Sequence, residues 1–257
     1  MTAVTSASGT LFVPTNNTPL VAQTSSNANA IVTLTQTTAT DTSNTVQLSG
    51  LSVQLAHSEA LLESRESTLT RSQLAAYAAA TEDKLGGYNY VAYRAAHNND
   101  VPKTEDPVLL ARAKQAKLFD AQRSQGSGSS VKNPFASLSA RQLDDVIYDD
   151  SGTYTVNERQ AAYFESFDRA SAWASAVVAQ LNRENDATGH YTGDALIEVL
   201  NHYNALSPIR QASYPANYAS DLKIQIQQYS SLGETSIGSD SSGIQTLIEG
   251  LTKTQST

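Results

Sequence analysis

The residues from Asp149 to Glu158 combine oxygen-bearing side chains with a glycine in a spacing that suits a divalent cation. Asp149, Ser151 and Thr153 alternate along the chain, Gly152 lies between the last two, and Glu158 follows five residues after Thr153. Calcium takes six to eight oxygen ligands, which loops supply through alternating short side chains, a glycine at a sharp bend and a bidentate carboxylate. The pattern therefore predicts a calcium site formed by Asp149, Ser151, Thr153 and Glu158.

A second segment repeats part of this pattern. Residues 149–155 and 186–192 share Asp, Gly, Tyr and Thr at equivalent places, at an offset of 37 residues. Asp186 and Thr188 stand where the first segment has Asp149 and Ser151, so they are the candidate calcium ligands of the second segment. We expect each segment to connect two helices.

Over residues 138–206 the two segments resemble a pair of EF-hand helix-loop-helix units. The resemblance implies that Asp149 takes the third loop position, that Glu158 takes the twelfth, and that calcium is the cofactor. The first position falls on Ile147, where the family has an Asp ligand. The second loop would end at Ala195 and would lack the closing carboxylate.

The same residues also fit an ordinary connection between helices. Asp149 and Ser151 favour Asx-type turns, Gly152 favours a positive φ, and Thr155 with Glu158 has the spacing of a capping box. This interpretation needs no metal. The sequence leaves both interpretations open.

Other residues with catalytic or metal-binding chemistry form weaker patterns. Glu198 and His202 lie one helical turn apart, which suits a zinc pair or an ordinary contact within a helix. The chain contains no HExxH, GxSxG or P-loop motif. The adjacent pair Asp144 and Asp145 would diverge by about 100° on a helix, so we expect both carboxylates on a solvated surface. An enzyme with an unrecognised site is kept as one alternative.

Composition narrows the classes of partner. The formal net charge of −8 and the absence of a local Lys/Arg cluster argue against binding to nucleic acid or to anionic membranes. No apolar run reaches the length of a membrane span. We expect no Sec-type signal peptide, because Met1 is not followed by a Lys/Arg region and an apolar segment. We therefore expect a soluble protein. The absence of cysteine excludes disulfides and thiolate chemistry.

Apolar periodicity and capping signals predict a mainly α, multi-helix bundle-like core that holds these residues. The expected helices begin near residue 52 and cover about 74–85, 107–123, 139–148, 155–183, 193–206 and 218–231. Tyr88, Tyr90 and Tyr93 are expected in a link between helices. Tyrosine is frequent, with twelve residues, and such rings suit either a protein interface or the rim of a core.

Composition also predicts where the chain divides. Residues 1–45 form a flexible Ser/Thr/Asn-rich extension, 46–124 a helical subdomain, 125–130 a Gly/Ser linker, 131–232 a second helical subdomain with the EF-hand-like connections, and 233–257 a flexible tail. The N-terminal extension is expected to be disordered or partly β. Its strand signal is the alternation of apolar and polar residues over 30–36 and 46–55, with Ser49 and Gly50 as a hairpin turn.

The start of the chain resembles a type III secretion signal. The first forty residues carry no charged side chain, are rich in Ser and Thr, and place the aliphatic residues Ala3 and Val4 near the N-terminus. The resemblance implies a bacterial protein that is exported without a Sec signal peptide. The bacterial cytoplasm is the alternative compartment.

Taken together, these features predict a non-enzymatic bacterial protein that acts through contacts with a protein partner and is exported. A calcium-binding or degenerate EF-hand-like module is the first alternative. An enzyme is the second.

Overall fold

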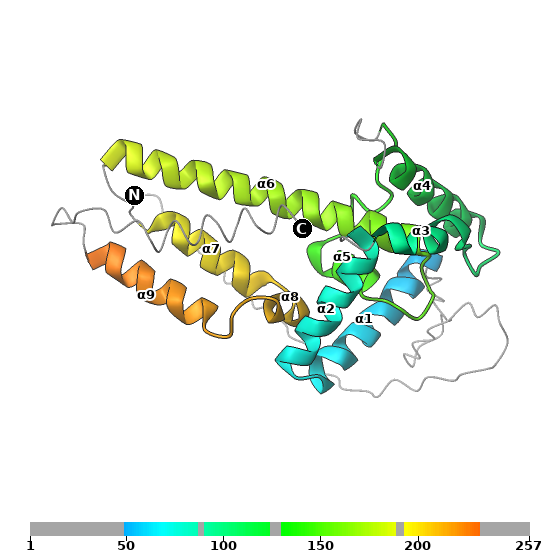
Figure 1. Ribbon diagram of the computed structural model, residues 1–257, viewed down its shortest axis with the longest axis horizontal. Coiled ribbons are helices and arrows are strands. Elements are labelled where there is room, and N and C mark those ends of the chain that lie inside the picture. Colours follow the sequence, from blue (N-terminus) through cyan, green and yellow to red (C-terminus); the bar gives the residue numbers. More distant parts are fainter. Residues whose placement is uncertain (1–48, 87–89, 124–129, 189–192, 232–257) are drawn as a thin grey trace, which may run out of the picture.

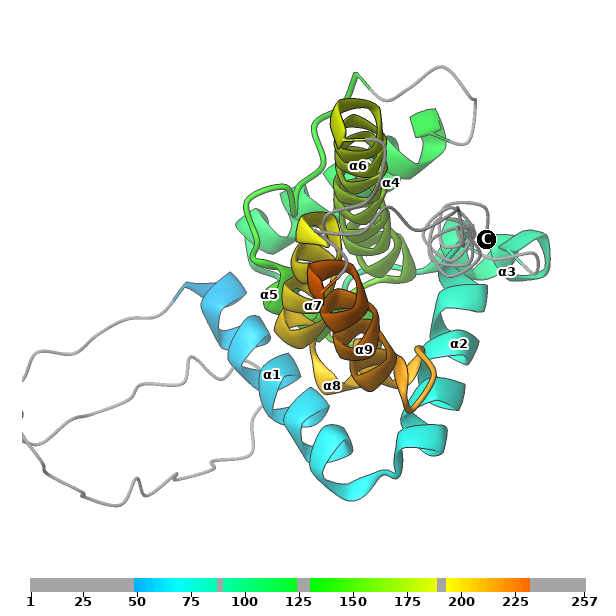
Figure 2. The same cartoon turned by 90° about the vertical axis from the view of Figure 1, so that its left-hand side faces the viewer.

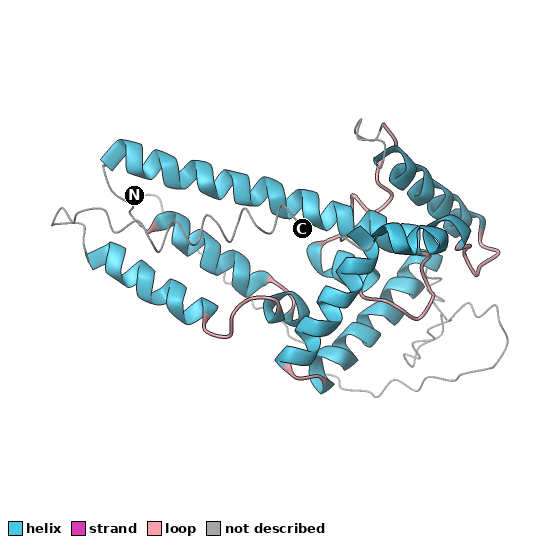
Figure 3. Ribbon diagram, in the orientation of Figure 1, coloured by secondary structure: helices cyan, strands magenta, loops and turns pink. Residues whose placement is uncertain are grey.

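The computed structural model describes residues 49–86, 90–123, 130–188 and 193–231. Within these ranges the chain forms nine α-helices and no strand (Figure 3). In chain order they are α1 (Gly50–Thr68), α2 (Arg71–Gly86), α3 (Tyr90–Asn99), α4 (Pro107–Arg123), α5 (Ala140–Ile147), α6 (Val156–Thr188), α7 (Asp194–Ala205), α8 (Pro208–Ala212) and α9 (Tyr218–Ser231). The predicted mainly α fold class is confirmed.

Side-chain caps fix the starts of several helices, as the sequence predicts. At α5, Ser139 and Gln142 form a complete capping box, in which each side chain bonds the backbone of the other. At α2, the backbone N–H of Thr70 donates to Gln73 Oε1 at 2.9 Å. Asp106 begins α4 by accepting a hydrogen bond from the backbone N–H of Val108 at 2.8 Å. These bonds satisfy N–H groups that a helix leaves without an intrahelical partner.

The helices pack into two parts that share the long helix α6 (Figure 1). We call one part the head: α1, α2, α4, α5, α8 and the first half of α6 surround the larger hydrophobic cluster, and α3 packs against α2 and α6. We call the other part the arm: the second half of α6 packs with α7 and α9 around a smaller cluster that includes Val177, Leu181 and Leu196. Seen from the end of the arm, the three helices α6, α7 and α9 lie close together in front of the head (Figure 2).

The division between these clusters lies within α6, and it differs from the predicted division at 125–130. Leu62 and Leu85, which precede that segment, share one core with Leu143 and Tyr148, which follow it. The segment 125–129 lies outside the described residues, as do the whole N-terminal extension 1–45, with its predicted strand at 30–36, and the tail 233–257. A Gly/Ser-rich composition marks a loop, but it says nothing about whether the flanking helices pack together.

Several element boundaries also differ from the prediction. Residues 50–55 belong to α1 and not to a strand, because Ser49 is the helix N-cap and accepts a hydrogen bond from the Ser52 backbone. The predicted tyrosine-rich link contains α3, and α6 continues beyond Arg183 to Thr188. Pro208 ends α7 as expected but also opens α8 as its first residue, a position that suits proline.

The head meets the arm at a cluster of tyrosines and one arginine. The rings of Tyr203, Tyr214 and Tyr218 lie with centroids 4.7 to 5.4 Å apart. Arg71 of α2 donates to the carbonyl oxygens of Gln211 in α8 and of Tyr214 in the connection between α8 and α9. Within the described residues, no helix combines the length and the apolar character that crossing a bilayer requires.

Candidate functional site

The connection between α5 and α6 has the turn geometry that the sequence predicts. The backbone N–H of Ser151 donates to Asp149 Oδ1 at 2.8 Å, and that of Thr153 donates to Ser151 Oγ at 3.3 Å. Gly152 has a φ of +85°, a conformation that favours glycine. The Asx-type turns and the positive φ are therefore confirmed.

Asp149 lies in the interior of the head and not on an open loop. Its side chain is 1% exposed, and its Oδ2 accepts a hydrogen bond of 2.6 Å from Ser58 Oγ on α1. Burial alone would raise the pKa of this carboxyl, but hydrogen bonds from Ser151 and Ser58 outweigh burial and lower the pKa. The carboxylate thus ties the connection to α1.

Glu158 is held from both sides by protein donors. Its Oε2 accepts hydrogen bonds of 2.9 Å from the backbone N–H and the hydroxyl of Thr155, which completes the predicted capping box of α6. Its Oε1 accepts a hydrogen bond of 2.8 Å from Arg112 Nε of α4. The pair is buried, since the side chains of Arg112 and Glu158 are 9% and 2% exposed.

The second predicted ligand set lies in a different setting. Asp186 is exposed and belongs to α6, and Thr188 is the last residue of that helix. The second EF-hand-like loop, whose twelve positions would cover residues 184–195, therefore begins inside a helix, and residues 189–192 lie outside the described part. Glu184 of α6 joins that helix to α7, because its Oε1 accepts a hydrogen bond from the backbone N–H of Ala195 at 3.1 Å.

The six predicted ligands are thus divided between the head and the far end of the arm. Across the described ranges, no group of three or more His, Asp or Glu side chains is placed to hold a metal ion. Calcium at Asp149, Ser151, Thr153 and Glu158 stays a prediction.

Asp144 and Asp145 are buried, and the prediction of a solvated surface for them is wrong. Asp144 Oδ1 accepts a hydrogen bond of 2.8 Å from Arg210 Nε of α8, and its Oδ2 accepts one of 2.7 Å from Ser207. Asp145 lies 3.3 Å from Arg141 Nε, one turn earlier in the same helix. The two carboxylates diverge as expected, but the head surrounds α5 on both sides.

Asp145 is the most strongly perturbed carboxyl group in this region. Burial raises its pKa to about 7, Arg141 opposes the shift, and the negative charges of Glu59, Asp144 and Glu66 add to it. The group therefore changes its charge near neutral pH. Because burial and the neighbouring carboxylates disfavour the ionised form, loss of this proton lowers the free energy of unfolding.

Glu198 and His202 share a tryptophan as their neighbour. The His202 ring stacks on Trp173 of α6 with ring centroids 3.6 Å apart, and Trp173 Nε1 donates to Glu198 Oε1 at 3.4 Å. Burial lowers the pKa of His202, and Glu198 opposes that shift. This arrangement joins α6 to α7.

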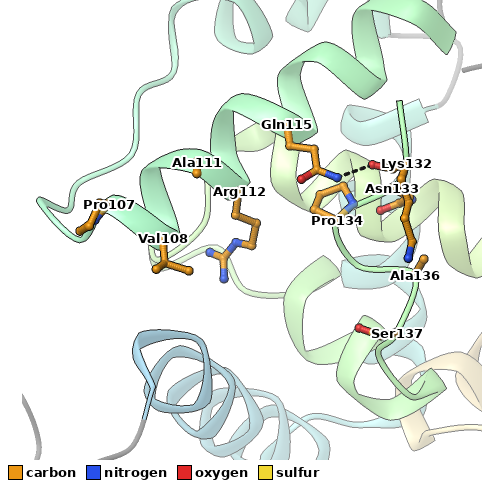
Figure 4. Close-up of a pocket in the computed structure, with 10 residues that line it drawn as sticks. All are labelled: Pro107, Val108, Ala111, Arg112, Gln115, Lys132, Asn133, Pro134, Ala136 and Ser137. Atoms are coloured by element: carbon orange, nitrogen blue, oxygen red, sulfur yellow. Dashed lines mark hydrogen bonds between the residues drawn. The ribbon is translucent and has the colours of Figure 1, made fainter. Parts of the chain in front are cut away.

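A groove of about 600 Å³ lies between α4 and the segment 132–137, next to the buried pair of Arg112 and Glu158 (Figure 4). Gln115 closes one end by donating from Nε2 to the carbonyl oxygen of Lys132 at 2.6 Å. The groove is lined by Pro107, Val108, Ala111, Arg112, Gln115, Lys132, Asn133, Pro134, Ala136 and Ser137.

Sequence reasoning missed two arginines that organise this region, Arg112 and Arg210. A signal for Arg112 was present, because it lies on the apolar stripe of α4 beside the buried residues Leu109, Ala113 and Ala116. A charged side chain on a core-facing stripe indicates a buried partner. The identity of that partner, 46 residues away in the case of Glu158, follows only from the fold.

The pKa of Asp145 predicts a measurable loss of stability as the pH rises. Between its ordinary pKa of 3.8 and about 7, the unfolded carboxyl releases its proton while the folded one keeps it. Stability from this group is therefore full below pH 3.8 and is lost as the pH rises through 7. In urea titrations, we expect the free energy of unfolding of the wild type to fall between pH 5 and pH 8 by about 2 kcal/mol more than that of Asp145→Asn. Equal losses would contradict the assignment, and Glu105→Gln, at an exposed carboxyl, should behave as the wild type does.

The calcium prediction has a direct test in Ser151, which is exposed at the fifth loop position. Because calcium would compete with Arg112 for Glu158, we expect weak binding in calorimetry, with a Kd of about 10⁻⁴ M or higher. Ser151→Asp adds a carboxylate to the ligand set and should tighten binding about tenfold, whereas Ser137→Asp outside the loop should not. No heat from either the wild type or Ser151→Asp would end the calcium interpretation.

No protein-family model, curated protein or solved structure matches this chain, so the geometry of its residues is the basis on which its function is argued.

Proposed function

We propose that this protein is non-enzymatic and acts by binding a protein partner at the outer side of the head, around α4. One observation carries the proposal. Of the six large hydrophobic side chains that are exposed in the described part of the chain, four lie between residues 101 and 118. They are Val101, Val108, Leu110 and Leu118, with exposed fractions of 70%, 71%, 40% and 49%.

Helix α4 occupies an outer position at the end of the head opposite the arm (Figure 1). Its inner face contributes Ala116 and Phe119 to the head cluster, while Leu110 and Leu118 stay in contact with water. Single exposed aliphatic residues are common, but a concentration on one peripheral element is typical of an interaction surface. Covering these side chains would release about 25 cal/mol for each Å² of apolar surface removed from water.

The helix that presents these side chains is firmly anchored. Arg123 donates two hydrogen bonds of 2.8 Å to Asp168 of α6, and its guanidinium lies 4.2 Å from the centre of the Phe164 ring. Arg112 fixes the other end of α4 through Glu158. A surface that is already ordered loses little conformational entropy when a partner binds, which favours association.

The lining of the adjacent groove supports binding over catalysis. It offers cationic and amide donors together with aliphatic and proline side chains, and none of its ten residues is a His, Asp or Glu. General acid-base catalysis uses such groups within hydrogen-bonding reach of the substrate.

Export is the second half of the proposal, and its support is the uncharged Ser/Thr-rich start of the chain. Residues 1–48 lie outside the described residues. The first described helix begins at Gly50, so residues 1–48 can serve as an export signal without including any described helix of the head.

Site-specific photocrosslinking tests the partner surface. A benzophenone amino acid at Leu118 should yield an adduct of one defined mass in the cells that make the protein, and the same probe at Ile224 on the arm serves as a matched control. Both positions are about half exposed, so neither replacement should disturb the core. An adduct at Ile224 together with none at Leu118 would contradict the proposed surface.

The export proposal is tested by fusing residues 1–50 to a reporter in a bacterium that has a type III secretion system. We expect the reporter in the medium of the competent strain and its retention in a secretion-deficient strain. A fusion of residues 50–86, which carries α1 and α2, should stay inside both strains. Retention of the first fusion in the competent strain would overturn this part of the proposal.

A further inference from the structure

The groove beside α4 is lined by apolar side chains and by two cationic ones, Arg112 on α4 and Lys132 on the opposite segment. Val108 and Ala111 line it from the helix, and Pro134 lines it from the opposite segment (Figure 4). The two ionisable residues of its lining are Arg112 and Lys132, and both are cationic. Because Glu158 compensates the charge of Arg112, Lys132 supplies the net positive charge of this groove, in a chain whose net charge is −8.

Arg112 is a rigid donor within this groove. Its guanidinium carbon lies 5.4 Å from the centre of the Phe135 ring and 5.1 Å from that of Tyr154, distances typical of cation-π contacts. Its Nε donates to Glu158, and its Nη2 donates to Gln54 Oε1 at 2.7 Å. These contacts hold the guanidinium in one position, so little of its conformational entropy is left to lose when a ligand binds.

The third nitrogen of Arg112 has no acceptor in the described structure. Nη1 is buried and without a hydrogen-bond partner, in a side chain that is only 9% exposed. A buried donor without an acceptor costs about 1–3 kcal/mol, and more for a charged group. An acceptor that reaches this nitrogen would recover that free energy, and a carboxylate would recover most.

Lys132 supplies a second cation at the rim. It is exposed, and its backbone carbonyl is fixed by Gln115 at 2.6 Å, so the start of its side chain is held beside α4 while the ammonium group remains in water. A flexible rim charge of this kind attracts an oppositely charged ligand and orients it.

We propose that this groove binds an extended, acidic segment of the protein partner, with aliphatic side chains against Val108 and Pro134 and a carboxylate between Lys132 and Arg112 Nη1. The inference rests on the proposed function, because it names the chemistry of the segment that the α4 surface receives. The apolar lining favours a peptide over a nucleic acid, whose phosphates call for several cations along the backbone. The net charge of the chain also repels nucleic acid.

Fluorescence anisotropy on the full chain tests the inference with two labelled peptides. One is a short peptide built from Pro, Leu and Glu, and the other replaces each Glu by Gln. We expect the acidic peptide to bind about tenfold more tightly at low salt, and this advantage to shrink as salt screens the charges. Equal affinities, or tighter binding of a single-stranded DNA oligonucleotide, would overturn the inference.

Variants at exposed positions locate the binding without risk to the fold. Lys132→Glu should lower the affinity for the acidic peptide about tenfold and leave the affinity for the Gln peptide unchanged. Val108→Ala should lower the affinity for both peptides. Lys223→Glu, a matched charge reversal at an exposed position of α9, should leave both affinities unchanged. An equal effect of Lys132→Glu and Lys223→Glu would overturn the inference.

Arginine side-chain NMR examines Arg112 directly, without replacing a residue on which the core depends. In protein labelled with ¹⁵N-arginine, the guanidinium signals of Arg112 should move on addition of the acidic peptide and stay in place with the Gln peptide. Unmoved signals at saturating acidic peptide would contradict the part assigned to Nη1. A crosslink at Leu118 combined with no preference for the acidic peptide would refute this inference and leave the proposed function standing.

Discussion

The head depends on guanidinium groups that satisfy the C-terminal end of the short helix α5. Arg159 donates from Nε and Nη2 to the carbonyl oxygen of Ile147, and Arg65 donates from Nη1 to that of Tyr148 at 2.5 Å. The last carbonyls of a helix have no intrahelical partner, and here they lie inside the core. Because a buried carbonyl without a donor is costly, α1, α5 and α6 can pack together only with these arginines in place.

The same requirement extends to the joint between the head and the arm. Arg210 of α8 donates to Asp144 at 2.8 Å and to Glu82 at 2.7 Å, while its guanidinium lies 5.1 Å from the centre of the Tyr148 ring. Removing one member of such a buried set leaves a charge without its partner, which costs about 3–5 kcal/mol. The geometry of Arg210 therefore sets where α8 docks on α5, and so where α7 and α9 leave the head.

The parts of this structure that the sequence predicts are those decided by neighbours in the chain. The capping box of Thr155 and Glu158 needs residues three apart, and it forms as expected. The burial of Asp144 and Asp145 depends on Arg210 and on helices that are distant in the sequence. The local pattern of two adjacent carboxylates therefore predicted a solvent-exposed position for both. The ion pairs of Arg112 with Glu158 and of Arg210 with Asp144 join residues 46 and 66 positions apart in the sequence. Such pairs depend on the topology of the fold, which the periodicity of a segment does not predict.

The two regions singled out by different arguments, the α5–α6 connection and the groove, share one side chain. Arg112 bonds the Glu158 carboxylate that caps α6, lies near the rings of Phe135 and Tyr154, and lines the groove with Val108. A ligand on either side would act on the same guanidinium: a cation at Glu158 would compete with it, and a carboxylate in the groove would share it. Binding of a cation at one region would therefore be linked to binding of a carboxylate at the other, and linkage of this kind is reciprocal.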